Sequence, residues 1–333
     1  LTIQMKQTLS IILLITLMVT VQSGMLNSAP VVSYIDTLKT WWGCNVANAL
    51  GLPNQYTNGA NVIALSFWTS NQGPADAVKV WSDLPSYIPG NCGYGSSNAE
   101  MQQNLINKFH ERGVKVIVAA FGATDYPTSR DPTQTCAALA KFVLANKLDG
   151  VDLDYEDSGA FEQGRGAQWL TTCTRVIRQY LPQGKYILTH APQGPYFTTS
   201  GMYPDGAYRT IDKEVGQMID WYNLQYYNQG DNTYTSYEDC FVKCKAFPGT
   251  AVLELKGMKS KIAVGKPVLK SDASNGWVSA STLASWLTKA NKEAGWCGGA
   301  MYWEASSDAD GSFGGAMRKS LNGFSGSCNS KFQ

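Results

Sequence analysis

The sequence predicts a single (β/α)8 barrel, and three observations lead to this fold class. Eight short apolar runs of the kind that buried parallel strands show recur along the chain, at intervals of roughly 30–45 residues. Helical stretches or polar loops separate these runs, which is typical of α/β proteins. The 333 residues suffice for one large α/β barrel or two ordinary domains, and no low-complexity linker divides them. We therefore expect one domain over residues 24–333, a TIM barrel.

The first half of the chain contains four predicted strands and two predicted helices. The strands are Val31–Ile35, Asn61–Trp68, Lys115–Phe121 and a run that begins at Leu148. Apolar residues at helical spacing predict helices over Ala99–Arg112, which Gly113 closes, and over about Thr133 to Asn146. The prolines and glycines of residues 70–97 predict a long loop with room for one short helical turn.

The second half repeats this order. Its predicted strands are Tyr186–Ala191, Trp221–Tyr227, Lys261–Val264 and Ala300–Trp303. Its predicted helices are Gln168–Leu181, Ser281–Ala294 and Ala316–Leu321. In barrels of this class the site lies at the carboxyl ends of the strands, so side chains at those ends are the candidates for chemistry.

The fourth strand has an unusual alternation of apolar and acidic residues. Val151 and Leu153 alternate with Asp152, Asp154 and Glu156, so the three acids share one strand face, with alternate residues roughly 6.5–7 Å apart. Neighbouring carboxylates repel each other and resist losing water. A solvated strand face or a cation site is the simpler interpretation of such acids. Three in register, separated by buried-type residues, favour acid/base chemistry instead.

The pattern Asp149-x-x-Asp152-x-Asp154-x-Glu156 resembles the Asp-x-x-Asp-x-Asp-x-Glu signature of family 18 glycoside hydrolases, the chitinase family. Three strand ends extend the resemblance, toward the plant class III branch. They are Ala191-Pro192-Gln193, the Gln-x-Tyr-Asn segment Gln225–Asn228, and Met301-Tyr302-Trp303. The matches run from about residue 31 to 305. One segment departs, because Ala120-Phe121-Gly122-Ala123 stands where the family usually has Ser-x-Gly-Gly.

The resemblance implies a role for each matching residue. Glu156 would protonate the glycosidic oxygen, while the substrate's own N-acetyl carbonyl attacks, with net retention; family 18 is known for this substrate-assisted route. Asp154 would accept the acetamido N–H, and Asp152 would share a proton with Asp154. The remaining implied roles are a hydrogen bond to the acetyl oxygen from Tyr227, a sugar floor at Trp303, substrate contacts at Gln225, Asn228 and Gln193, and structural support at Asp149 and Gly122. Neither a metal nor an organic cofactor is required.

Several of these residues also have a structural interpretation. Trp303 could belong to the core, Tyr227 could bond within the barrel wall, and Gln225 and Asn228 could cap loops. The two histidines are assigned structural places: His190 packs on a strand, and His110 lies on a helix surface.

The N-terminus predicts secretion. Lys6 precedes the apolar run Leu9–Val21, and the small residues Ser23 and Gly24 follow it, so residues 1–23 are interpreted as a signal peptide. The run is 13 residues long, whereas a membrane span needs about 20. Eight cysteines allow up to four disulfides outside the cell, and we expect Cys44 to pair with Cys92. The presence of only two histidines and the oxidising surroundings argue against zinc at Cys240 and Cys244.

The charge pattern gives no electrostatic reason to expect nucleic acid as a partner, since the net charge is +1 and no basic run occurs. We expect a secreted, monomeric chitinase that acts on chitin or chito-oligosaccharides, without a membrane partner and without an appended carbohydrate-binding module. An endo-β-N-acetylglucosaminidase acting on N-glycans is the enzymatic alternative. A non-catalytic chitinase-like lectin is the alternative from another class, although such proteins commonly lose the acid at the Glu156 position. A structural or inhibitor role on the same barrel is a third option.

Overall fold

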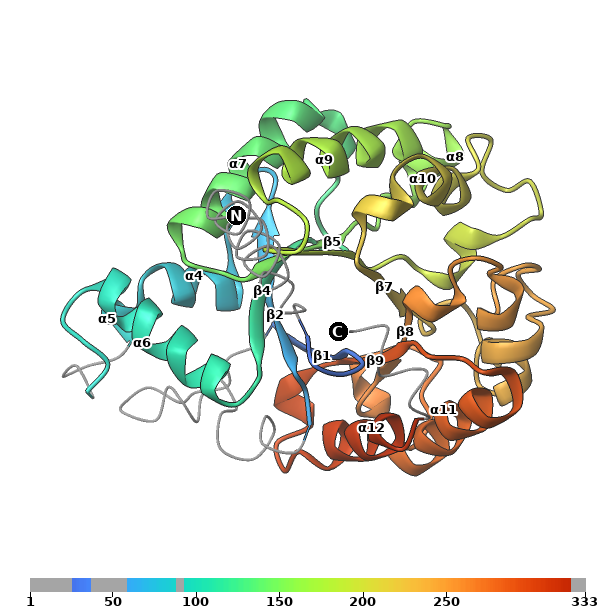
Figure 1. Ribbon diagram of the computed structural model, residues 1–333. Helices are drawn as coiled ribbons and strands as arrows, with labels where there is room; N and C mark the ends of the chain where they lie inside the picture. The colour runs from blue at the N-terminus through green and yellow to red at the C-terminus, as the bar shows by residue number, and fades with distance from the viewer. Residues whose placement is uncertain (1–25, 37–58, 88–92, 325–333) are drawn as a thin grey trace, which may run out of the picture.

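The structure is a computed structural model that describes residues 26–36, 59–87 and 93–324. Eight parallel strands form a closed barrel, and helices surround the strands on the outside (Figure 1). The predicted fold class is therefore confirmed. The predicted signal peptide and the predicted Cys44–Cys92 pair lie outside the described residues.

The barrel strands follow one another around the barrel in chain order. They are β1 (Val31–Ile35), β2 (Val62–Thr69), β4 (Lys115–Phe121), β5 (Gly150–Asp154), β6 (Ile187–His190), β7 (Trp221–Gln225), β8 (Ile262–Pro267) and β9 (Gly299–Trp303). Closure occurs at β1, where Val32 is opposite both Val62 of β2 and Met301 of β9. A short strand, β3 (Gly73–Pro74), pairs antiparallel with β2 outside the barrel.

The outer layer consists of helices that pack their apolar sides on the strands. They are α4 (Asp76–Ser82), α5 (Leu84–Tyr87), α6 (Asn98–Glu111), α7 (Pro132–Ala145), α8 (Ser158–Glu162), α9 (Gly166–Tyr180), α10 (Ala207–Val215), α11 (Ala280–Ala294) and α12 (Ser312–Asn322). The ends follow local chemistry. At α7, the side chain of Asp131 accepts the N–H of Gln134 and Pro132 occupies the first turn, while α11 ends at Gly295 in the left-handed region.

The prediction of a long loop over residues 70–97 was wrong in part, because α4 and α5 lie there. Pro85 is compatible with α5 since it occupies the first turn, where a backbone N–H has no partner within the helix. Ala77, Val78 and Trp81 form a buried face on α4, which packs against β2. Seven residues are too few for this face to be recognised against the surrounding prolines and glycines.

The alternation along each strand separates two apolar regions. Outward side chains, such as Val151 and Leu153 of β5, pack under the helices. Inward side chains, such as Val32 and Ala119, fill the barrel together with Tyr34 and Met301. Asp152 and Asp154 therefore point into the barrel, as the period-2 pattern predicted.

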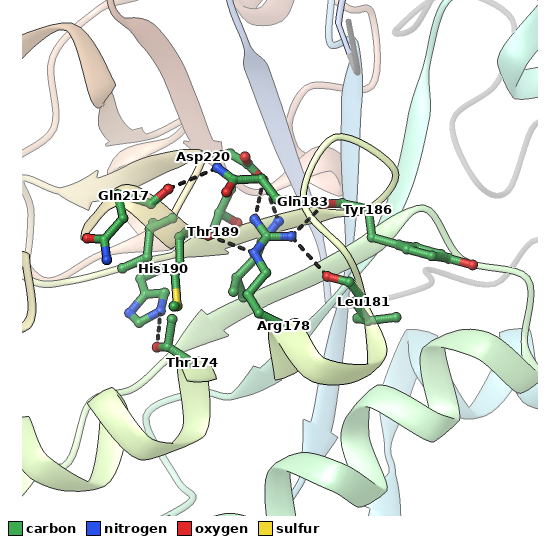
Figure 2. A network of polar contacts seen from close by, with 12 residues as sticks. Thr174, Arg178, Leu181, Gln183, Tyr186, Thr189, His190, Gln217 and Asp220 are labelled. Carbon is green, nitrogen blue, oxygen red and sulfur yellow. Dashed lines mark hydrogen bonds and ion pairs between the residues drawn. The ribbon is translucent and has the colours of Figure 1, made fainter. Parts of the chain in front are cut away.

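A buried ion pair fastens the barrel at the N-terminal ends of β6 and β7. Arg178 of α9 donates to the carboxylate of Asp220 over 2.9 Å, and Asp220 accepts the N–H of Leu188 over 2.7 Å. Figure 2 shows the guanidinium lying between Asp220 and the carbonyl oxygens of Tyr186 and Leu181, at 2.8 and 3.2 Å. These extra hydrogen bonds satisfy a charge pair whose side chains are less than a tenth exposed.

The cysteines of the described residues are in two states. Cys136 on α7 and Cys173 on α9 form a disulfide, whereas Cys240 and Cys244 are free and buried. Cys297 is also in a disulfide. Among the described helices, none has the length and apolar character to cross a bilayer.

Candidate active site

The acidic residues on and after β5 meet side chains from three other strands at the carboxyl end of the barrel. Asp152 and Asp154 lie within β5, and Glu156 follows two residues after the strand ends. Contributions from neighbouring strand ends are Tyr34 of β1, Thr189 of β6, Gln193 after β6, and Asn223 and Gln225 of β7. Active sites of this barrel class occupy that end.

Asp152 lies deepest in this group and is fully buried. Its carboxylate accepts hydrogen bonds from the hydroxyl of Tyr34 at 2.7 Å, the hydroxyl of Thr189 at 2.5 Å and the amide of Asn223 at 3.0 Å. Burial raises the pKa of Asp152, and these three donors oppose the rise. These three hydrogen bonds stabilise the ionised form of Asp152 inside the barrel, where water does not reach it.

Asp154 is held differently. Burial, followed by the charges of Glu156 and Asp152, raises the pKa of Asp154 well above its usual range. Its side chain forms a hydrogen bond with Glu156, so the two carboxyl groups titrate as a pair. The proton that Asp152 is expected to share with Asp154 remains a prediction, and the carboxyl group hydrogen-bonded to Asp154 in this structure is that of Glu156.

Two glutamine amides surround Glu156. Gln193 donates to one carboxylate oxygen over 2.7 Å, and Gln225 lies 3.5 Å from the other. Gln225 also donates to Asp154 at 2.8 Å and to the carbonyl oxygen of Ala191 at 2.9 Å. Burial raises the pKa of Glu156, which is the direction that a general acid requires. Both predicted glutamines therefore contact the carboxylates.

Tyr227 faces the same row. Burial, then the charges of Asp154, Glu156 and Asp152, raise the pKa of Tyr227 well above its usual range, so its phenol stays neutral and can donate a hydrogen bond. The backbone before it is fixed by buried Lys266, whose ammonium donates to the carbonyl oxygens of Tyr226 and Gly276 at 2.7 and 2.9 Å. Gly276 is required there, since a Cβ would come within 2.6 Å of the Tyr227 Cα atom.

Trp303 forms an aromatic wall beside the carboxylates. Its ring lies 5.9 Å from that of Phe67, nearly parallel, and 6.1 Å from that of Tyr34. Gly122, with φ of +76°, donates its N–H to the carbonyl oxygen of Asp154, and a Cβ on it would lie 3.1 Å from the Phe67 ring. A glycine at position 122 thus leaves room for the Phe67 ring next to the end of β5. Ala123, the next residue, differs from the family pattern.

Two predicted residues lie away from the carboxylate row. Asp149 precedes β5, where it accepts the N–H of Val116 at 2.8 Å and contacts His110 at 2.9 Å, which agrees with the structural role expected for it. Asn228 is exposed, and its side-chain oxygen accepts the N–H of Ser274 at 2.8 Å. Asn228 holds a loop in this structure rather than contacting the acids.

His190 is buried beside Thr174 and Tyr208, and burial lowers its pKa to about 3.

Three residues of the site were not predicted: Tyr34, Thr189 and Asn223. All three lie on predicted strands and point inward with the same parity as the acids. The signal that could have found them is the polar side chain at an inward position of an otherwise apolar strand, as at Asn223, two residues before Gln225.

Comparisons with known proteins agree with this fold. No protein-family model matches the chain. It is 29% identical over 223 residues to Endochitinase 3 of Metarhizium anisopliae, a match that covers 61% of this chain and 68% of the relative. A GH18 chitinase from Pseudoalteromonas aurantia superposes with a TM-score of 0.66 at 26% identity, over 88% of this chain and 100% of the other. A fungal endo-β-N-acetylglucosaminidase of glycosyl hydrolase family 18 superposes with a TM-score of 0.60 at 19% identity, over 88% and 98%, which shows the fold alone.

Proposed function

We propose that this chain, which is a glycoside hydrolase of family 18, is a secreted chitinase that cleaves β-1,4 linkages between N-acetylglucosamine units. The observation on which the proposal rests is the row of three carboxylates at the carboxyl end of the barrel, buried Asp152 and Asp154 and half-buried Glu156, each of which accepts a hydrogen bond. The relative named endochitinase and the structural neighbour named chitinase support the choice of substrate.

Glu156 is the proton donor in this proposal. It lies at the rim of the row, and burial raises its pKa, so it can hold a proton until the glycosidic oxygen accepts it. The hydrogen bond with Asp154 connects the two groups. One proton held by the pair can leave through Glu156 while Asp154 takes up the negative charge.

The attacking group comes from the substrate. Family 18 enzymes use substrate assistance in place of a carboxylate nucleophile. The acetamido carbonyl oxygen attacks the anomeric carbon as the glycosidic bond breaks, giving an oxazolinium ion. Ionised Asp154 accepts the acetamido N–H and balances the positive charge, and neutral Tyr227 donates to the acetyl oxygen. Water, deprotonated by Glu156, then opens the ion with retention.

The aromatic wall has the binding role. Trp303 lies between Tyr34 and Phe67 at the ends of three strands, and it remains partly exposed, so its face can stack on the apolar face of a sugar ring. Gln193 and Gln225 hold the carboxylates, and we assign them to orientation of the acids and to contacts with the sugar next to them.

The alternative functions differ in substrate or in turnover. A neighbour named as an endo-β-N-acetylglucosaminidase shares the fold, which keeps an N-glycan substrate as the second candidate. The lectin alternative is disfavoured because Glu156 is present with two amide contacts.

Product analysis tests the proposal. The mature protein is incubated with a chitin hexamer and, separately, with a high-mannose glycopeptide, and the anomeric configuration of the first product is read by proton NMR. We expect cleavage of the hexamer to β-anomers and no release of the glycan. Release of the glycan alone would assign the second function, and binding without cleavage would assign a lectin.

A further inference from the structure

A polar pair on β7 lies beneath the carboxylate row, inside the barrel. Asn223 is fully buried, and its amide nitrogen is 3.0 Å from Asp152, 3.1 Å from the hydroxyl of Tyr34 and 3.4 Å from that of Thr189. Trp221, two residues earlier on the same inward face, donates its indole N–H to the side-chain oxygen of Asn223 over 2.9 Å.

The indole determines which way the amide points. An Asn side chain can present either its oxygen or its nitrogen to a neighbour, and contacts alone decide the orientation. Because the Trp221 N–H can only donate, the Asn223 oxygen must face it, and the NH2 group must face Asp152. The reverse orientation would set two donors against each other at Trp221 and two acceptors against each other at Asp152.

We propose that Asn223, oriented by Trp221, is a positioning residue that keeps Asp152 the ionised member of the carboxylate row. This inference rests on the proposed function. Tyr34 and Thr189 supply two donors to Asp152, and Asn223 supplies the third while also touching both of those hydroxyls. An ionised Asp152 behind Asp154 favours a proton on Asp154, which then bonds Glu156.

The surroundings of Asp152 make this amide significant. The titratable groups whose charges couple to Asp152 are Asp154 on the same strand, Tyr34 of β1, Tyr208 of α10 and Tyr227 after β7. Burial raises the pKa of each of these tyrosines, so they stay neutral at ordinary pH. Among these neighbours, hydrogen-bond donors rather than a cation therefore compensate the charge on Asp152.

The sign of the effect on stability follows from burial. The pKa of Asp152 is raised in the folded state, so its contribution to stability decreases as the pH rises through that value. Asn223→Leu removes a donor to the ionised form and raises this pKa further. The variant must then lose more stability than the parent on the alkaline side, and the difference between them must widen with increasing pH.

The test compares unfolding of the full chain by denaturant at several values between pH 4 and pH 8, for the parent and Asn223→Leu. Thr174→Val is the matched control, because it removes a buried hydroxyl that bonds Leu170 and His190, away from the carboxylates. We expect the ratio of folding constants, parent over Asn223→Leu, to grow by about tenfold or more across the range, since one pKa unit corresponds to tenfold. The ratio for the control should stay flat.

A second variant covers the case in which Asn223→Leu does not fold. Trp221→Phe keeps an aromatic ring and removes the indole N–H, so the amide of Asn223 can turn over. The ratio of folding constants, parent over Trp221→Phe, should also grow with pH, by a smaller factor than for Asn223→Leu. In an Asp152→Asn background the widening should disappear for either substitution. A flat ratio for Trp221→Phe or for Asn223→Leu, or widening that persists with Asp152→Asn, would overturn the inference. Because the readout is unfolding, a protein that cleaves no chitin would still give a decisive result here.

Discussion

The side-chain amide of Gln225 donates to Asp154 over 2.8 Å and lies 3.5 Å from Glu156, so a single residue at the end of β7 connects the last carboxylate of β5 with the one that follows the strand. The same amide group is anchored to the carbonyl oxygen of Ala191 at 2.9 Å. The geometry of the acid pair therefore depends on the register between β7 and its neighbours. Substitutions around this amide should change proton transfer before they change the fold.

Replacing Gln225 by Leu should shift the pH profile. The amide lowers the pKa of both Asp154 and Glu156, so its loss raises both values, and the pair retains its proton to higher pH. We expect the alkaline limb of kcat/KM to move upward, by about 1 pH unit, while kcat falls by about tenfold or more because the acids are less well held. The measurement is kcat/KM for a chito-oligosaccharide between pH 4 and pH 9. An alkaline limb that moves downward would contradict this assignment.

Tyr227→Phe should reduce turnover with little change in stability. The substitution removes only the phenolic hydroxyl, which we assign to the acetyl oxygen in the transition state, and a single donor of this kind contributes about 10²–10³ in kcat. Tyr226→Phe is the matched control, since the Tyr226 hydroxyl donates to the carbonyl oxygen of Thr250 on the other side of the chain. The control should lose thermal stability and keep its kcat. Equal kinetics for the two variants would remove Tyr227 from the mechanism.

Trp303→Ala should weaken binding of oligosaccharides. The ring stacks beside Phe67 and Tyr34, and a partly exposed indole is suited to a sugar face. We expect KM for a chitin hexamer to rise by about tenfold, with a further loss in kcat where the sugar is also oriented by the ring. Binding to an inactive Glu156→Gln background, measured by calorimetry, separates affinity from turnover. Unchanged affinity in that background would place Trp303 in the core.

The buried ion pair between Arg178 and Asp220, at the N-terminal ends of β6 and β7, provides a test of stability. Arg178→Met leaves Asp220 buried without its cation, and breaking such a pair costs about 3–5 kcal/mol. Arg175→Met, one turn earlier on α9, is the control, because its ion pair with Glu214 is roughly half exposed and such pairs contribute at most about 1 kcal/mol. Denaturant unfolding measures both. If the two variants lose equal stability, the network in Figure 2 does not fasten β6 and β7 as described.

The barrel could be predicted because short apolar runs recur along the chain between helical stretches, and because the acids on and after β5 alternate with apolar residues and so reveal which side chains point inward. α10 was missed, since its nine residues begin after Gly206 in a left-handed conformation and include five polar residues. The family resemblance singled out Gln225 and Gln193 as substrate contacts, whereas their hydrogen bonds to the carboxylates became visible only in the structure. Asn228 occupies a similar position in sequence, yet its φ of +62° turns the chain out of the strand direction and away from the acids. The contact between Asn223 and Asp152 could not be predicted, because the sequence does not give the distance between side chains of β5 and β7 inside the barrel.

The most direct test of the account is hydrolysis of a chitin oligomer by the parent and by Glu156→Gln. Glu162→Gln serves as the matched control, being the same substitution at an exposed residue of α8. We predict turnover by the parent and the control, and a loss of at least ~100-fold in Glu156→Gln, the scale of a general acid. A Glu156→Gln variant that cleaves the oligomer at the parent's rate would contradict the assignment of Glu156 as proton donor.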